Sequence, residues 1–121
     1  MAPHNELGKL GEEAVIRHLT ESGYHILEHN WFYRKYEVDI IAENDEWIIF
    51  VEVKTRTSKQ WGNPEESVSK NKINRIVEAA EFYLINNNIS KSVRFDVAAV
   101  VIERCGIEIE YIDDAFLSPA K

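Results

Sequence analysis

Residues 46–56 read Glu-Trp-Ile-Ile-Phe-Val-Glu-Val-Lys-Thr-Arg, an apolar run that ends in alternating charged residues. The apolar part, from Trp47 to Val51, predicts a buried strand. Glu52 and Lys54 are two residues apart, so their side chains leave the same face of that strand, about 7 Å apart along it. Either the strand leaves the core after Val51, or these charges belong to a site. For an isolated Glu-Val-Lys the first interpretation is favoured, because charges at strand ends are common.

The preceding residues, 36–43, alternate between two faces and predict a second strand. The turn signal Asn44-Asp45 between the two strands predicts an antiparallel hairpin. A two-residue turn there would place Asp39 opposite Phe50, so Asp39 and Glu52 would be diagonal neighbours on one face, with Cβ atoms about 7 Å apart. A register slip of one residue would move Asp39 to the other face, so this pairing depends on the turn.

Two carboxylates at that separation can be bridged by a divalent cation, whose oxygen ligands lie at about 2.1 Å. Without a cation they would repel each other, and the pKa of one would rise. A third carboxylate, Glu12, lies in the apolar stripe of residues 5–22, which predict a helix, whereas Glu13 belongs to a solvated ladder of alternating charges. Glu12 either reaches water at the helix edge or joins an acidic site, and the sequence leaves both interpretations open.

The rest of the chain completes an αβββαββ order. Residues 24–33 predict a strand with a bend, residues 93–102 a central strand, and residues 107–112 a half-exposed strand. A second helix begins between Asn63 and Lys70 and ends at Asn86-Asn87-Asn88; its N-cap is either Asn63, in a capping box with Glu66, or Ser69. This order implies an α/β (α+β) fold class, a mixed central sheet with helices packed on it, in a single domain covering residues 1–121.

Length and composition exclude several classes of protein. The chain has 121 residues, 45% hydrophobic and 29% charged, which is one globular domain rather than a disordered or coiled-coil chain. Its single cysteine, Cys105, excludes an internal disulfide and a thiolate zinc site. No apolar run approaches the length of a membrane span, and residues 1–6 show no signal-peptide pattern, so we expect a cytoplasmic protein with no membrane partner.

The net charge of −7 is unevenly distributed. Residues 54–75 carry a local charge of +4, with only Glu65 and Glu66 opposing six basic residues. This segment is either a solvated loop and helix start or a site for a polyanion such as nucleic acid. The basic residues are Lys54, Arg56, Lys59, Lys70, Lys72 and Arg75.

Several motifs together resemble one family. They are Gly8-x-x-Gly11-Glu12, Glu37-Val38-Asp39-Ile40-Ile41-Ala42, Phe50-Val51-Glu52-Val53-Lys54-Thr55-Arg56, Gly62-x-Pro64, Lys72, Ala80, Tyr83-Leu84, Arg94-Phe95-Asp96-Val97 and Ala115-Phe116. The set resembles the UPF0102 (YraN-like) family over nearly the whole chain. Its members are predicted nucleases related to archaeal Holliday junction resolvases, with a PD-(D/E)XK restriction-endonuclease-like fold. Tyr36 departs from the pattern, because the family usually has glycine there.

The resemblance implies an αβββαβ core and a divalent-metal-dependent endonuclease acting on DNA, including branched or junction DNA. It implies that Asp39 and Glu52 bind Mg²⁺ or Mn²⁺, with the Val53 carbonyl as a third ligand, and that Glu12 completes the acidic site. Lys54 would orient or activate the attacking water, or neutralise charge on the phosphate. Lys72 would contact a phosphate, and the basic residues Arg56, Lys59, Lys70 and Arg75 would hold the DNA backbone through phosphate contacts.

Two other functions remain compatible with the sequence. One is a nucleic-acid-binding module of the same fold without catalysis, and the other is an interaction protein with an acidic surface. Symmetric cleavage of a junction would require two active sites and hence a homodimer. Trp31-Phe32-Tyr33, before Arg34-Lys35, could stack on bases, although aromatic residues in a strand more often pack in the core. We expect the histidines to be structural or at the surface, and Asp96 to be hydrogen-bonded in a structural role.

Overall fold

The computed structural model describes residues 4–57 and 69–115. The elements follow the predicted αβββαββ order. They are α1 (His4–Glu21), β1 (His25–Tyr33), β2 (Tyr36–Glu43), β3 (Trp47–Arg56), α2 (Lys70–Asn86), β4 (Ser92–Glu103) and β5 (Gly106–Ile112). Among the described residues no helix is both long and apolar enough to cross a membrane.

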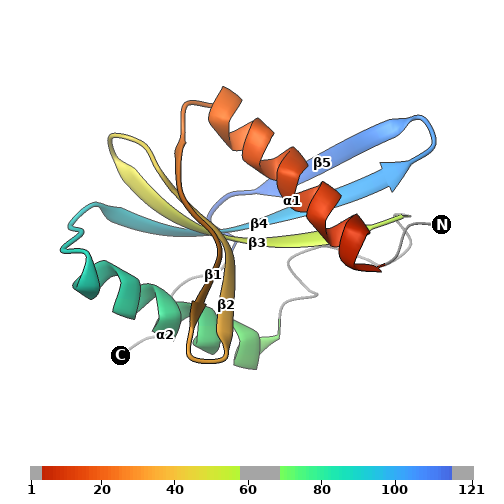
Figure 1. Cartoon of the computed structure of the whole chain (residues 1–121). Coiled ribbons are helices and arrows are strands. Elements are labelled where there is room, and N and C mark those ends of the chain that lie inside the picture. Colours follow the sequence, from red (N-terminus) through yellow and green to blue (C-terminus); the bar gives the residue numbers. More distant parts are fainter. Residues whose placement is uncertain (1–3, 58–68, 116–121) are drawn as a thin grey trace.

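The strands form one five-stranded sheet in the order β1-β2-β3-β4-β5. β3 and β4 are parallel and are joined through α2, while the other neighbours are antiparallel. The predicted mixed sheet of the α+β class is therefore confirmed. Figure 1 shows the twist of the sheet and the tip of the β1–β2 hairpin beside the first turns of α2.

The two helices cover opposite faces of the sheet (Figure 1). Ile48 and Phe50 of β3 pack with the buried residues of α2, whereas Ile49 and Val51 pack with those of α1. This division follows from the alternation of side chains along a strand. Since Glu52 and Lys54 continue the row of Ile48 and Phe50, they leave the sheet on the α2 side.

The β2–β3 hairpin corrects the predicted turn. Glu43 pairs with Ile48 and Ile41 pairs with Phe50, so the two-residue turn, which placed Asp39 opposite Phe50, was wrong. A type I′ turn needs positive φ at both central residues, and Asn44 has no positive φ; its side chain instead accepts hydrogen bonds from the N–H groups of Glu46 and Trp47. The resulting shift is two residues, so Asp39 and Glu52 stay on one face, whereas Val38, predicted on the face of Ile40 and Ala42, packs with the α2-side cluster instead.

The second helix begins at Lys70, and Ser69 is its N-cap, with Oγ accepting a hydrogen bond from the Lys72 N–H at 3.2 Å. Ser69 was one of the two predicted caps; the other, Asn63, lies outside the described residues. The helix ends at Asn86, as predicted. The cap therefore holds Lys72 within the first turn of α2, next to the sheet.

β4 is an interior strand, and Asp96 within it is fully buried. Arg94 donates two hydrogen bonds to Asp96, at 2.9 Å each, and the Tyr111 hydroxyl and the Asp114 N–H also donate to it. The hydrogen bonds to Asp96 raise the pKa of the Arg94 guanidinium above its usual range. This network joins β4 to β5 and agrees with the structural role predicted for Asp96.

We predict that Asp96→Ala lowers the free energy of unfolding by about 3 kcal/mol, because it leaves the nearly buried Arg94 without its carboxylate partner. Tyr111→Phe, which removes one donor only, should cost about 1 kcal/mol. Urea denaturation followed by circular dichroism measures both values. Equal and small losses in the two variants would show that the network contributes little to stability.

Candidate active site

The site lies where β2 and β3 separate. Their ladder ends at the pair Ile40–Val51, while β3 continues to pair with β4 as far as Arg56. Just beyond the last pair, Asp39 Oδ2 accepts a hydrogen bond from the Val53 N–H at 2.8 Å. Because the N–H and C=O groups of a strand residue point to the same edge, the Val53 carbonyl also faces the opening between the strands. At this point a hydrogen bond to the Asp39 side chain takes the place of the backbone hydrogen bonds between β2 and β3.

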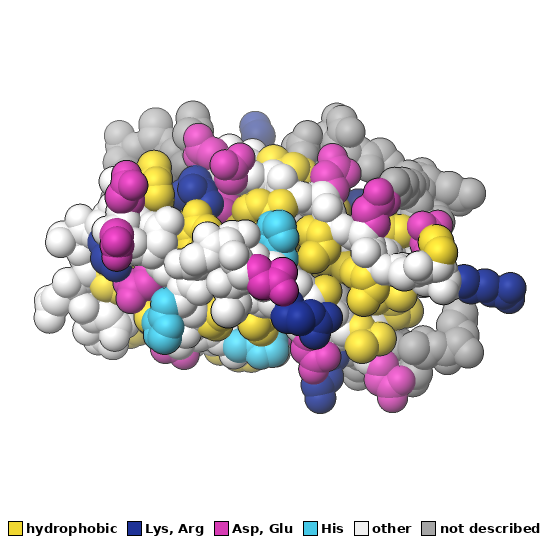
Figure 2. All heavy atoms as spheres, turned by 90° about the horizontal axis from the view of Figure 1, so that it is seen from above, with side chains coloured by type: hydrophobic (Ala, Val, Ile, Leu, Met, Phe, Trp, Pro, Cys, Tyr) yellow, Lys and Arg dark blue, Asp and Glu magenta, His cyan; other side chains and the backbone are white. Residues whose placement is uncertain are grey.

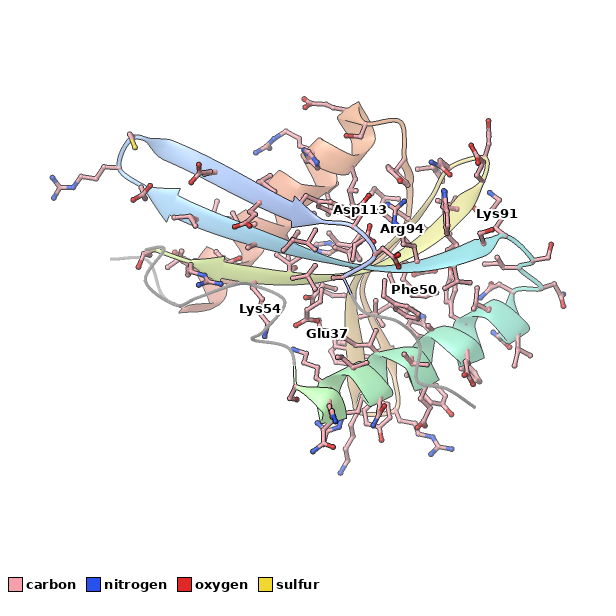
Figure 3. The ribbon with its side chains drawn as sticks, turned by 180° about the vertical axis from the view of Figure 1, so that it is seen from behind. Glu37, Phe50, Lys54, Lys91, Arg94 and Asp113 are labelled. Carbon is pink, nitrogen blue, oxygen red and sulfur yellow. The ribbon has the colours of Figure 1, made fainter. Side chains whose placement is uncertain are left out.

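Glu52 is almost fully buried and forms ion pairs with two lysines. Its Oε2 lies 2.5 Å from Lys72 Nζ and 3.6 Å from Lys54 Nζ. Burial alone would lower the pKa of Lys72, but the contact with Glu52 and the charge of Asp39 raise it overall. The Lys72 ammonium is therefore held positive, and Lys54 points to the same α2 side of the sheet in Figure 3.

Asp39 is the most perturbed acid of the site. Burial, together with the charges of Glu52, Glu12 and Glu37, raises its pKa to about 8, although the hydrogen bond from Val53 opposes the shift. The pKa of Glu37 is also raised, by burial and by Glu12 and Glu52. Negative charge is therefore concentrated here beyond what the chain itself neutralises, which is the condition that a divalent cation relieves.

Glu12 approaches the opening from α1 on the other side. A Cβ at Gly11 would lie 1.9 Å from Thr55 Oγ1, so only glycine allows α1 to pack this closely on β3. Glu12 Oε1 lies 2.9 Å from His29 Nε2 of β1. Of the two interpretations that the sequence left open, Glu12 therefore faces the acidic site. His29 was not expected there, and no spacing in the sequence connects it with Glu12.

Two grooves meet at the carboxylates. The first groove, about 620 Å³, runs between α1 and β3 and is lined by Glu12, by the end of β3 from Glu52 to Arg56, and by Thr57. The second groove, about 260 Å³, runs between the β1–β2 hairpin tip and α2 and is lined by Lys35, Tyr36 and Arg75. Both grooves share the walls formed by Asp39, Glu52 and Lys72.

The structure brings together most of the predicted site residues. The first groove contains Glu12, Asp39, Glu52, Val53, Lys54, Arg56 and Lys72, and Arg75 lies in the second groove. Lys70 is exposed at the first position of α2 and lines neither groove. Lys59 lies outside the described residues.

The donor atoms fit a hard divalent cation. Mg²⁺ binds through one or two carboxylates and keeps several waters, and Asp39, Glu52 and the Val53 carbonyl supply oxygen ligands at one edge. Within residues 4–57 and 69–115, no group of three or more His, Cys, Asp or Glu side chains is close enough to hold a metal. Of the predicted ligands, Glu12 therefore forms no close three-carboxylate group with Asp39 and Glu52 within these residues.

Comparisons with known proteins agree on one family. The profile of the family described as "Uncharacterised protein family UPF0102" matches residues 11–100. A UPF0102 protein of Flavobacterium psychrophilum is 45% identical over 96% of this chain and 98% of its own length. One from Christiangramia forsetii is 44% identical over 96% and 98%, and one from Phocaeicola vulgatus is 43% identical over 98% of both chains.

Among solved structures, that of Pyrococcus furiosus SfsA in complex with Ca²⁺ superposes with a TM-score of 0.39 at 15% sequence identity. The superposition covers 88% of this chain and 62% of the SfsA chain. We draw no functional inference from a likeness of this degree.

The raised pKa of Asp39 predicts how stability depends on pH without added metal. Between the ordinary pKa of 3.8 and about 8, the folded chain keeps a proton on Asp39 that the unfolded chain has lost. The free energy of unfolding should therefore fall as pH rises through this range. Asp39→Asn should flatten the dependence, leaving the smaller contribution of Glu37, which has the same sign.

Urea denaturation at pH 5 and pH 8 in EDTA tests this prediction. Asp45→Asn, at an exposed position in the β2–β3 turn, is the matched control and should retain the full pH dependence. An identical fall in stability in Asp39→Asn and in the control would show that Asp39 is ionised normally.

Proposed function

The chain belongs to the UPF0102 family, and from this premise we propose that it is a divalent-metal-dependent nuclease that hydrolyses DNA phosphodiester bonds. The observation that carries the proposal is the pairing of two buried carboxylates with two lysines at the junction of two open grooves. A buried carboxylate pair with a raised pKa beside fixed cations is an arrangement typical of catalytic sites. The resemblance of the motifs to the PD-(D/E)XK pattern supports the same reading.

Asp39, Glu52 and the Val53 carbonyl would hold Mg²⁺ or Mn²⁺. When bound, such an ion polarises the phosphate and lowers the pKa of a coordinated water. The protein's part is to present these oxygens in advance, since the Val53 N–H holds the Asp39 carboxylate and Lys72 holds that of Glu52. Glu12, held by His29, adds negative charge on the α1 side of the opening.

Lys54 and Lys72 would stabilise the reacting phosphate. Both ammonium groups lie at one oxygen of Glu52, so phosphate oxygens next to that carboxylate would meet two positive charges. Positive charge placed where negative charge develops lowers the barrier of hydrolysis. Lys54 is also suited to orient the attacking water, because it extends from β3 on the face that carries Glu52.

The substrate would be held mainly through its phosphates. Arg56 and Thr57 continue the first groove beyond the carboxylates, and contacts of this kind carry no sequence information. With a net charge of −7, binding should be weak and strongly salt-dependent. Branched or junction DNA is the substrate that the resemblance favours, and its symmetric cleavage would require a homodimer.

A second candidate function is a nucleic-acid-binding module without catalysis. The observation that favours it is that two of the acidic side chains already have ion-pair partners within the chain: Lys72 and Lys54 for Glu52, and His29 for Glu12. In such a module the same ion pairs would stabilise the groove and would not be exchanged for a metal. The two functions differ in one observable, which is metal-dependent cleavage.

The test is cleavage of labelled single-stranded, duplex and four-way-junction DNA at low salt, with Mg²⁺, Mn²⁺ or EDTA. We expect cleavage with metal only, and a loss of at least about 100-fold in Glu52→Gln, which keeps the shape of the side chain but removes a ligand charge. Glu110→Gln, on an exposed position of β5, is the matched control and should cleave normally. Circular dichroism confirms that each variant is folded.

Equal cleavage by wild type and Glu52→Gln would contradict the proposed active site. Binding of DNA without cleavage under any of these conditions would contradict the nuclease and support the binding module. Absence of both binding and cleavage would contradict both candidates.

A further inference from the structure

The second groove shares Asp39, Glu52 and Lys72 with the first groove, but Lys54 does not line it. Its outer rim carries Lys35 of the β1–β2 hairpin tip and Arg75 of α2, both exposed. Among the described residues, neither side chain forms an ion pair with a carboxylate, whereas Lys54, Lys72, Lys91 and Arg94 all do. Two unpaired cations therefore face the outer end of this groove.

An aromatic row holds this rim in place. Tyr33 of the hairpin stacks on Phe82 of α2 with ring centroids 4.5 Å apart, and Tyr36 lies 6.4 Å from Tyr33. The Arg75 guanidinium lies over the Tyr36 ring at 5.8 Å from its centroid. The row fixes the hairpin tip against α2 and holds Arg75 over an aromatic face, so the cation is preorganised rather than mobile.

Two sequence features can be placed here: the aromatic run of residues 31–33, of which Phe32 is 58% exposed, and Tyr36. Trp31 and Tyr33 pack against α2, with Trp31 in edge contact with Tyr83 at 5.1 Å, and so belong to the core and its border rather than to a stacking surface for bases. Tyr36 has no positive φ, so its replacement of the usual glycine causes no backbone strain. Instead, it supplies the ring on which Arg75 rests.

On the α1 side, the described residues carry interspersed charges of both signs (Figure 2). Figure 3 shows Glu37 and Lys54 on the α2 side of the sheet, where the two grooves meet. A polyanion that reaches the carboxylates through the first groove therefore meets Lys35 and Arg75 next if it continues along the second.

We infer that Lys35 and Arg75 form a phosphate-binding subsite for the nucleic-acid strand that continues past the reacting phosphate, with Tyr36 as the positioning residue of Arg75. This inference rests on the proposed function for the identity of the ligand. The acidic floor of the groove, formed by Glu37, Asp39 and Glu52, lies at its inner end. The phosphates would be contacted at the outer rim, where the cations stand without carboxylate partners.

The test measures binding rather than cleavage, so it does not depend on turnover. Fluorescence anisotropy of labelled single-stranded and junction DNA, in EDTA and at several salt concentrations, gives the affinity and its salt dependence. For Lys35→Ala/Arg75→Ala we expect affinity at low salt to fall at least about 10-fold and the slope of log K against log salt to decrease by about 1.5 to 2, as for two lost phosphate contacts. Arg17→Ala/Arg104→Ala, which removes two exposed cations outside both grooves, is the matched control and should keep the wild-type slope.

Tyr36 has its own test. Tyr36→Phe keeps the ring and should bind DNA as the wild type does. Tyr36→Ala should lower the affinity for DNA, but by less than Arg75→Ala does. The double variant Tyr36→Ala/Arg75→Ala should be no weaker than Arg75→Ala alone, because the ring acts through the guanidinium. Independent, additive losses would contradict the positioning role.

The outcomes separate this inference from the proposed function. A wild-type slope in Lys35→Ala/Arg75→Ala, in a protein that binds and cleaves DNA, would overturn the subsite and leave the nuclease intact. A reduced slope in a protein that binds but never cleaves would support the subsite and contradict the nuclease. A wild-type protein that binds no DNA at low salt would overturn both.

Discussion

The hydrogen bond from the Val53 N–H to the Asp39 carboxylate is the contact on which the site depends. At this point β2 leaves β3, and a buried backbone N–H without a partner would be costly. The Asp39 carboxylate accepts the hydrogen bond of the Val53 N–H. The two strands can therefore separate without leaving this backbone N–H unpaired. The opening that results admits side chains from both helices to one place, which neither face of an unbroken sheet could do.

Charge balance explains why one carboxylate of this opening is ion-paired and the other is not. Glu52 is nearly fully buried, and a buried carboxylate needs a cation close to it. Lys72 and Lys54 supply that charge from α2 and from the same strand. Asp39 has no such partner, and its raised pKa is the direct consequence. The site therefore combines one neutralised and one unneutralised carboxylate, which suits the exchange of a proton for a metal ion.

The two grooves place this pair of carboxylates in the middle of a path rather than at the end of a pocket. A small substrate would occupy only one groove, whereas a polymeric substrate would extend into both grooves. The acidic composition of the protein does not oppose the proposed binding of a polyanion, because Lys35 and Arg75 are exposed at the rim whereas Asp39 and Glu52 are buried. The aromatic row from Phe82 to Tyr36 gives the hairpin tip the rigidity that a binding rim requires.

The order of the elements and the shared face of Asp39 and Glu52 follow from local patterns in the chain, because alternation along a strand has a period of two. The predicted register was wrong by two residues. Because two is a full period of the alternation, Asp39 and Glu52 are still on one face. Ser69, one of two possible caps, and Glu12 within an apolar stripe were likewise readable from local patterns. Three other contacts could not be predicted from local patterns: His29 meets Glu12, Gly11 lets α1 approach Thr55, and the Tyr36 ring lies under Arg75. These contacts join residues far apart in the chain, and their geometry is set by the packing of helices on a twisted sheet, which no local spacing encodes.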